Sequence, residues 1–229
     1  MKSETTAEAV PERRPRLNRR QVLEAALRLV DRDGLDELSM RKLAAELGVE
    51  AMSLYKHVAN KDDLLAGLAD LVWAEIAAAA PARDDWPAWL RTVGHAVRDV
   101  VHRHPRALPV LVSGDVSPVS ALELFADQLE RRGPAAPGPD QAVSALRAVT
   151  AFALGCVVTE LCCFGPVPAN RDETERQRLL RVSRALPPDT PDRLLDTALA
   201  VCGDCDAEKM FTEGLDLIVA GAQPRHRRR

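Results

Sequence analysis

Residues 50–61 join short or polar side chains to a group of hydrogen-bond donors, a combination suited to contact with duplex DNA. The segment starts with Glu50, Ala51, Met52 and Ser53, and such side chains at the beginning of a helix can enter the major groove. Donors to phosphate oxygens follow, and these position a protein without reading sequence: Tyr55, Lys56, His57 and Lys61. Tyr55 could instead be a packed aromatic residue, but its place beside Lys56 and His57 favours the phosphate contact.

Short helices are predicted to position this segment. Asn18 can cap a first helix, Gln21 can answer it in a capping box, and Gly34 ends the helix. Between them, apolar residues recur at helical spacing: Val22, Ala25, Ala26, Leu29 and Val30. A second helix is predicted over 39–48 and a third over about 50–57. Two short helices joined by a glycine-containing turn form a helix-turn-helix unit.

The rest of the chain is predicted to be helical as well. Asn60 caps a fourth helix that Pro81 ends. Further helices are expected over about 86–103, 106–112, 117–133, 140–163, 172–185, 190–202 and 206–222, with loops or tails at 82–85, 164–171 and 223–229. Because no strand pattern or internal repeat is visible, the sequence predicts an all-α fold, with a three-helix helix-turn-helix domain followed by a larger helical domain.

Composition agrees with a helical core and an intracellular protein. Aromatic residues are only 3%, so Ala, Leu and Val must build the core, and Ala and Leu favour helix. No uninterrupted apolar run reaches the about 18 to 20 residues that a membrane span needs, and the polar N-terminus lacks a signal-peptide core. We therefore expect a cytoplasmic protein without a membrane partner, whose five cysteines are reduced.

Basic charge is concentrated at the two ends of the chain. Residues 1–61 carry 12 Lys/Arg against 10 Asp/Glu, residues 62–224 carry 15 against 24, and the last five residues include four arginines. An acidic body with a basic head is typical of a DNA-binding head on a body that does not bind DNA. We expect a disordered basic arm at 1–16, which is either a solvated tail or a contact to phosphates or the minor groove, a DNA-binding domain at 17–63, a second domain at 64–222 and a basic tail at 223–229.

Residues 17–62 resemble the TetR family of repressors closely and without gaps. The resemblance is carried by Arg41-Lys42-Leu43-Ala44, Leu47-Gly48-Val49, Leu54-Tyr55, His57-Val58 and Asn60-Lys61. Residues 152–160 and 211–221 are similar to the long dimerisation helix and the final helix of the family's tetracycline-repressor branch. The resemblance implies a repressor whose larger domain binds a ligand and dimerises, and the sequence leaves an activator or a ligand-free regulator as the alternative. It implies no cofactor.

Within the head, the resemblance assigns roles residue by residue. It implies that Arg41 reaches a base edge and that four residues contact phosphates: Ser53, Tyr55, His57 and Lys61. The chain departs from the family at Met40, where the family has a threonine, and at Ala51-Met52, where it has a Gln-Pro pair whose glutamine reads a base. We therefore expect an operator different from that of the tetracycline repressors, with Ala51 or Met52 in apolar contact with a thymine methyl.

A homodimer is expected because one chain offers one recognition helix. A two-fold pair places two of them about 34 to 36 Å apart, which matches the half-sites of a palindromic operator in double-stranded DNA. The apolar helices 140–163 and 206–222 are the expected dimer surface, through Leu154, Gly155, Val158, Gly214, Leu215 and Ile218. Packing of these residues inside one chain is the alternative for part of each helix.

The resemblance implies an apolar ligand pocket in the larger domain. Candidate lining residues are Trp86, Trp89, His95, His102, Phe125, Phe152, Thr159 and Cys163, each of which could also be an ordinary core or surface residue. Tetracycline with magnesium is disfavoured, because Thr159 stands where the family has a metal-holding glutamate and Ala77 where it has a drug-contacting histidine. Glu160 follows the position of that glutamate by one residue, and on a helix this step rotates its side chain by about 100°. We expect another small hydrophobic ligand.

Two other classes of function were weighed against a ligand-responsive regulator. Cys202-Gly203-Asp204-Cys205 has the spacing of a metal or redox site, and Cys162 and Cys163 could complete it, but adjacent cysteines on a helix point in different directions. An enzyme is not expected, because the sequence has no nucleophile elbow, phosphate loop, HExxH motif or paired acid constellation.

Overall fold

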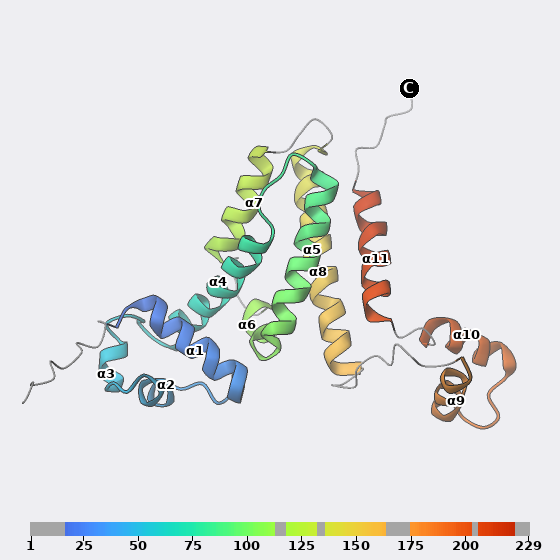
Figure 1. Cartoon of the computed structure of the whole chain (residues 1–229), viewed down its shortest axis with the longest axis horizontal. Helices are drawn as coiled ribbons and strands as arrows, with labels where there is room; N and C mark the ends of the chain where they lie inside the picture. The colour runs from blue at the N-terminus through green and yellow to red at the C-terminus, as the bar shows by residue number, and fades with distance from the viewer. Residues whose placement is uncertain (1–16, 113–117, 132–135, 164–174, 203–205, 223–229) are drawn as a thin grey trace, which may run out of the picture. The chain divides into compact units, whose positions relative to one another are not determined.

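The computed structural model describes residues 17–112, 118–131, 136–163, 175–202 and 206–222, and within them every regular element is a helix. This confirms the expected all-α class. The chain divides into two compact units, an N-terminal unit ending at Leu68 and a C-terminal unit beginning at Ala69. The helices are α1 Arg19–Asp33, α2 Met40–Leu47, α3 Ala51–Leu54, α4 Lys61–Ala79, α5 Trp86–Arg103, the 3-10 helix η1 Pro105–Ala107, α6 Leu108–Val112, α7 Val119–Arg131, α8 Pro139–Cys163, α9 Glu175–Ala185, α10 Asp192–Cys202 and α11 Ala207–Gly221 (Figure 1).

Local hydrogen bonds set the ends of the first two helices as the sequence predicts. Asn18 Oδ1 accepts from the Gln21 N–H at 2.9 Å, and Gln21 Oε1 accepts from the Asn18 N–H at 3.0 Å. Ser39 Oγ accepts from the Lys42 N–H at the start of α2. The turn after α2 needs a left-handed residue, and Gly48 supplies it with φ 64° and ψ 35°.

The third helix is shorter than the predicted 50–57. It ends at Leu54, and residues 55–57 form a turn. The Lys56 and His57 N–H groups donate to carbonyls three residues back, at 3.4 and 2.8 Å, which is the tighter pattern of a helix end. Three predicted contact residues, Tyr55, Lys56 and His57, therefore lie in a turn rather than on the helix.

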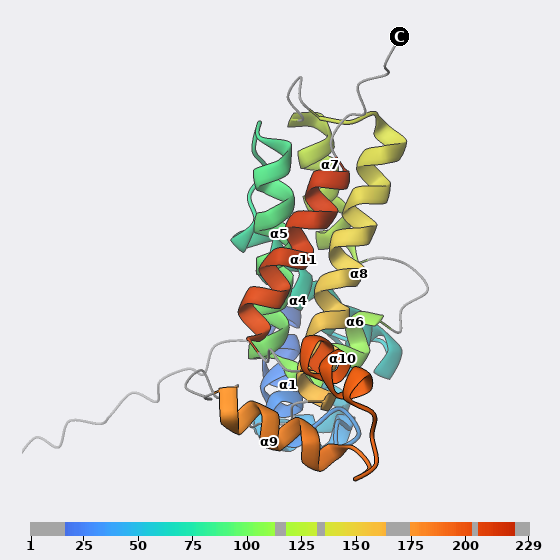
Figure 2. The same cartoon turned by 90° about the vertical axis from the view of Figure 1, so that its right-hand side faces the viewer.

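Each unit has its own hydrophobic core. In the N-terminal unit the core joins α1, α2, α3 and the start of α4 through fully buried residues that include Val22, Leu29, Leu43, Leu54, Val58 and Leu64. In the C-terminal unit α5, α8 and α11 lie side by side, as Figure 2 shows. A Cβ added to Gly94 on α5 would lie 2.8 Å from Leu215 Cδ2 on α11, so the glycine permits this close approach.

Helix α8 is long and apolar enough to cross a membrane by length and composition, over Pro139–Leu161. A core helix of a helical protein has the same composition, and α8 packs against both α5 and α11. It also carries Glu160 in an ion pair with Arg98 of α5. The helix is therefore explained as the central core helix of the C-terminal unit.

Candidate functional sites

The predicted DNA-contacting residues of the N-terminal unit lie on α2, on α3 and in the turn that follows. Arg41, Glu50, Lys56 and Lys61 are exposed, and so are Met52 at 73% and Tyr55 at 46%. Ala51, Ser53 and His57 are half-buried. Leu54 and Val58 are buried at 0% and 1%, and they anchor this segment in the core. The structure thus brings all nine predicted residues into the helix-turn-helix segment and the start of α4.

An ion pair fixes the turn between α3 and α4. Arg19 Nη2 and Nη1 donate to Asp63 Oδ1 and Oδ2 at 2.6 and 2.9 Å, and Nη1 also donates to the His57 carbonyl at 2.8 Å. Asp63 Oδ2 accepts a further bond from the Ala59 N–H at 2.8 Å. Hydrogen bonds from Arg19 and then from Ala59 lower the pKa of Asp63 to about 2. The carboxylate is therefore ionised at neutral pH, and it holds both ends of the turn.

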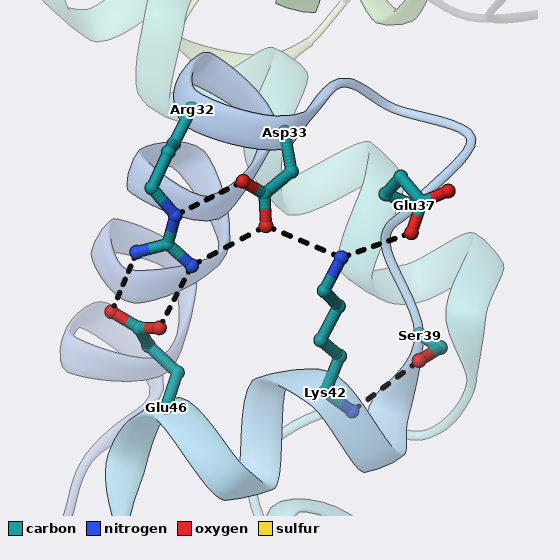
Figure 3. Close-up of polar contacts among 6 residues, drawn as sticks. All are labelled: Arg32, Asp33, Glu37, Ser39, Lys42 and Glu46. Atoms are coloured by element: carbon teal, nitrogen blue, oxygen red, sulfur yellow. Dashed lines mark hydrogen bonds and ion pairs between the residues drawn. The ribbon is translucent and has the colours of Figure 1, made fainter.

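A second charged cluster fastens α2 to the end of α1 (Figure 3). Arg32 pairs with Asp33 at 3.1 Å and with Glu46 at 3.0 Å. Lys42 pairs with Asp33 at 3.2 Å and with Glu37 at 2.9 Å. These contacts lower the pKa values of the Asp33 and Glu46 carboxyls and raise the pKa of Lys42. Arg41 lies on α2 together with Lys42 and Glu46. The cluster therefore orients the helix that presents Arg41.

The cations of the N-terminal unit fall into two groups with different surroundings. Arg19, Arg32 and Lys42 are held in the ion pairs just described. Among the described residues, Arg41, Lys56 and Lys61 make no ion pair, although Arg41 and Lys42 are neighbours in sequence. The second group can therefore meet phosphates or bases without first breaking an internal salt bridge.

A buried charged network joins three helices of the C-terminal unit. Arg98 of α5 is 9% exposed, and it donates to Glu160 of α8 at 3.2 Å and to Glu208 of α11 at 2.5 Å. His102 Nε2 lies 2.5 Å from the second oxygen of Glu160. Burial by itself lowers the pKa of Arg98, but the bonds to Glu208 and Glu160 outweigh it and raise the pKa above its ordinary value.

Aromatic rings pack beside this network. Phe211 of α11 stacks on Phe152 at 5.5 Å, meets His95 edge-on at 5.1 Å and lies under the Arg98 guanidinium at 4.9 Å. The structure thus brings two predicted ligand residues, His95 and Phe152, into contact with Phe211, while a third, His102, contacts Glu160 of the charged network. Sequence reasoning did not select Arg98, Glu208 or Phe211. The available signal was an arginine inside the apolar run Ala96-Val97-Arg98-Asp99-Val100-Val101.

The other predicted ligand residues lie apart from this group. Trp86 and Trp89 are buried against each other with rings 5.5 Å apart, and Trp89 Nε1 donates to the Ala80 carbonyl. Phe125 meets Trp73 edge-on at 6.0 Å. The exposed Thr159 hydroxyl donates to the Gly155 carbonyl within α8, and the side chain of Cys163 lies outside the described residues.

The predicted dimer residues divide into interior and accessible positions. Leu215 is buried at 1%, and a Cβ on Gly214 would lie 2.5 Å from Phe152 Cζ, so both belong to packing within one chain. Gly155 is exposed with open space around it, and Val158 is 41% exposed. Leu154 and Ile218 are half-buried.

The cysteine side chains proposed for a redox or metal site, at 162, 163, 202 and 205, lie outside the described residues. The described Cys156 is half-buried, and burial, followed by the charge of Glu160, raises the pKa of its thiol. A raised pKa disfavours the reactive thiolate. In the described ranges no group of three or more His, Cys, Asp or Glu side chains could hold a metal ion.

Comparison with protein families matches almost the whole chain. Residues 22–68 match the family model for bacterial regulatory proteins of the tetR family. Residues 78–225, more than half of the chain, match the model for the tetracyclin repressor-like C-terminal domain.

Individual proteins give the same result. The chain is 31% identical over 209 residues to an HTH-type transcriptional regulator of Saccharopolyspora erythraea, covering 91% of this chain and 85% of that protein. It is 29% identical over 208 residues to the class D tetracycline repressor protein of Escherichia coli, covering 90% and 89%. The crystal structure of the Streptomyces coelicolor TetR family protein ActR with actinorhodin has a TM-score of 0.70 at 24% identity, covering 92% and 96% of the two chains, and it shows the shared fold. None of these comparisons supports a redox or metal sensor.

Proposed function

The chain belongs to the TetR family of bacterial regulatory proteins, and from this premise we propose that it is a repressor that binds a palindromic operator as a homodimer and leaves it when a small hydrophobic ligand binds. Members of the family are DNA-binding transcriptional regulators that generally respond to ligands. The operator, the dimer, the direction of control and the ligand are the parts that we propose. Such a protein would act in the cytoplasm, where its operator is accessible.

One observation carries the DNA-binding part. Arg41, Lys56 and Lys61 are exposed and make no ion pair within the described chain, whereas Arg19, Arg32 and Lys42 of the same unit are paired with carboxylates. Phosphate contacts are favoured for cations that only water solvates, because breaking an internal salt bridge would offset part of the gain. The rigid ion pairs around Arg19 and Arg32 hold the recognition segment in one orientation before DNA binds.

Exposed apolar side chains support the homodimer. Val158 and Leu161 on α8 are 41% and 39% exposed, and Leu217 on α11 is 76% exposed. Large apolar side chains gathered on neighbouring helices are typical of a protein interface. Of the residues predicted for the dimer, the proposal keeps Leu154, Gly155, Val158 and Ile218.

Two buried donors support a ligand in the C-terminal unit. Trp73 and Trp86 are 5% and 1% exposed, and neither indole N–H has a hydrogen-bond acceptor in the described part of the chain. A buried donor without an acceptor costs free energy, which an oxygen atom of an otherwise apolar ligand would recover. Tetracycline with magnesium stays disfavoured, because the residues expected to hold it are replaced by Thr159 and Ala77.

Helix α4 can couple ligand binding in the C-terminal unit to DNA binding in the N-terminal unit, because its residues belong to both units. Its first residues belong to the N-terminal unit, where Asp63 bonds to Arg19. Its later residues belong to the C-terminal unit, where Asp70 accepts from the Ser120 N–H at 2.8 Å and Glu75 pairs with Arg103 at 2.9 Å. In the proposal, the ligand binds more tightly to a conformation in which α4 has moved and the two recognition segments no longer match the half-sites.

Selection from a random duplex library tests the DNA-binding part on the purified full chain. We expect a palindromic site to be enriched, and we expect Lys56→Ala with Lys61→Ala to weaken binding to that site and to unrelated duplexes alike. Arg193→Ala, which removes an exposed arginine of α10, serves as the matched control and leaves binding unchanged. Failure to enrich any duplex would contradict the proposal.

A fluorescence titration tests the ligand part. All three tryptophans lie in the C-terminal unit, so hydrophobic compounds that release the operator should also change tryptophan emission. Trp86→Phe keeps an aromatic side chain at this position but replaces the indole and removes its N–H, and it should weaken both responses. Operator binding that no candidate compound affects would argue against ligand control.

A further inference from the structure

Three buried polar groups of the C-terminal unit have no hydrogen-bond partner among the described residues. They are the indole N–H groups of Trp73 and Trp86 and the hydroxyl of Thr150. An indole nitrogen can only donate, whereas a hydroxyl can donate or accept. The third tryptophan differs from the other two, because Trp89 Nε1 already donates to the Ala80 carbonyl at 3.2 Å. The interior of this unit therefore lacks hydrogen-bond acceptors rather than donors.

The carboxylates in the interior of the unit already have partners. Within the described ranges its other acidic residues are exposed, and the half-buried ones are Asp70, Glu75 and Glu160. The first accepts from the Ser120 N–H at 2.8 Å, the second pairs with Arg103 at 2.9 Å and the third with Arg98 at 3.2 Å. A cationic ligand would therefore have to displace an existing partner before it could pair with one of these carboxylates.

The cations in the interior are matched in the same way. Of the arginine and lysine residues described in this unit, only Arg91 and Arg98 are not exposed. Arg91 pairs with Asp216, and Arg98 is shared between Glu160 and Glu208. An anionic ligand could accept from the indoles, but it would be buried without an unpaired cation. Burial of an unpaired charge costs far more than burial of a neutral acceptor.

These two balances define the charge and the polarity of a matching ligand. Building on the proposed function, we propose that the ligand is an uncharged compound with oxygen acceptors, such as a ketone, a quinone or an ester, and that Trp73 and Trp86 select it by donating to these oxygens. The aromatic rings of Phe125, edge-on to Trp73, and of Trp89, beside Trp86, supply apolar surface for the rest of the compound. Cationic and anionic compounds of the same size are rejected.

Four probes built on naphthalene test this inference on the full chain at pH 7. They are 2-acetylnaphthalene, which is an uncharged acceptor, 2-ethylnaphthalene, which has no polar group, the cation of 1-(2-naphthyl)ethylamine, and the anion 2-naphthoate. Calorimetric titration ranks their affinities. We expect the ketone to bind about fivefold more tightly than the hydrocarbon, because it satisfies a buried donor. It should bind about tenfold or more tightly than either ion.

Nuclear magnetic resonance identifies the donor, because the chain has only three tryptophans and hence three indole N–H signals. With nitrogen-15 labelled tryptophan, 2-acetylnaphthalene should shift the signal of Trp73 or Trp86 and leave that of Trp89, whose donor is already in use, in place. Trp73→Phe combined with Trp86→Phe should abolish the preference for the ketone over the hydrocarbon. Val119→Ala, which truncates an exposed side chain of α7, is the control and should keep this preference.

The outcomes separate this inference from the proposed function. It is overturned if either ion or 2-ethylnaphthalene binds as tightly as the ketone, if the ketone shifts the Trp89 signal alone, or if none of the probes binds. Duplex selection decides operator binding independently of these results. Release of the operator by a charged compound would leave ligand control standing and overturn the present inference alone.

Discussion

Arg19 and Asp63 lie 44 residues apart in sequence and face each other across a two-pronged ion pair, with N–O distances of 2.6 and 2.9 Å. The pair joins the first turn of α1 to the first turn of α4. Because Arg19 also donates to the His57 carbonyl, the turn that carries three predicted phosphate contacts is closed by the same guanidinium group. The stability of the N-terminal unit and the presentation of the DNA-binding segment therefore depend on one carboxylate.

The first prediction concerns the charge on Asp63. Asp63→Asn should destabilise the N-terminal unit by about 1 kcal/mol at neutral pH, less than the full pKa shift implies because the partner Arg19 is partly exposed to solvent. A carboxylate whose pKa is lowered on folding stabilises the fold above its unfolded value, and this stabilisation is lost as pH falls through the folded value. The difference between wild type and variant should therefore shrink between pH 3.8 and about 2.

Urea unfolding followed by circular dichroism measures this difference, and tryptophan fluorescence reports the C-terminal unit separately. Asp62→Asn, one residue earlier and exposed, is the control and should be neutral. A variant difference that is independent of pH would contradict the assignment.

The second prediction compares two arginines that link α5 to α11. Arg98→Met should destabilise the C-terminal unit by about 2 kcal/mol or more, because it leaves Glu160, only 13% exposed at its side chain, with His102 as its one remaining partner among the described residues. Arg91→Met breaks the pair with Asp216, in which the side chains are 42% and 53% exposed, and should cost less than about 1 kcal/mol. Equal losses of stability in thermal unfolding of the two variants would show that the Arg98 network stabilises the unit no more than the exposed Arg91 pair does.

The third prediction concerns the contact between Gly214 and Phe152. A Cβ at position 214 would lie 2.5 Å from Phe152 Cζ and 2.9 Å from Cε2, so Gly214→Ala must displace a ring that stacks on Phe211. We expect a loss of about 1 to 3 kcal/mol in chemical unfolding. Gly221→Ala, at the end of the same helix with open space around it, should be close to neutral. A stable Gly214→Ala protein would mean that the ring moves freely.

The fourth prediction concerns the proposed dimer. Leu217→Asp places a charge on an α11 residue that is 76% exposed, and it should shift the chain towards monomer in light scattering and weaken operator binding at least tenfold. Val112→Asp changes an apolar residue of α6 that is 62% exposed, and it should do neither. A Leu217→Asp variant that stays dimeric would place the interface on another surface.

Features set by local hydrogen bonds could be predicted from the sequence. The Asn18 and Gln21 capping box, the Ser39 cap and the left-handed Gly48 all involve residues within four positions of one another. The end of α3 at Leu54 was missed because the helical pattern of 50–57 does not distinguish a helix from the turn that closes it. Tertiary packing decides that boundary.

Contacts between distant segments could not be predicted in this way. The Arg98 and Glu208 pair spans 110 residues, and although the apolar neighbours of Arg98 set it apart, nothing in the sequence indicates that Glu208 is its partner. Gly214 and Leu215 were expected at a dimer surface because small and apolar residues suit any close helix contact. Only the packing of α11 on α5 and α8 shows that they are used within the chain.

The division between tied and untied cations also sets how strongly binding will respond to ionic strength. Of the basic residues described in the N-terminal unit, Arg19, Arg20, Arg32 and Lys42 are already neutralised by carboxylates, while Arg28, Arg41, Lys56 and Lys61 are not. Of the second set, Arg41, Lys56 and Lys61 belong to the proposed DNA-binding segment, and each of them that contacts a phosphate should contribute about 0.9 to the logarithmic salt slope. Among the basic residues described in this unit, some therefore shape the protein while others are available to attract the duplex.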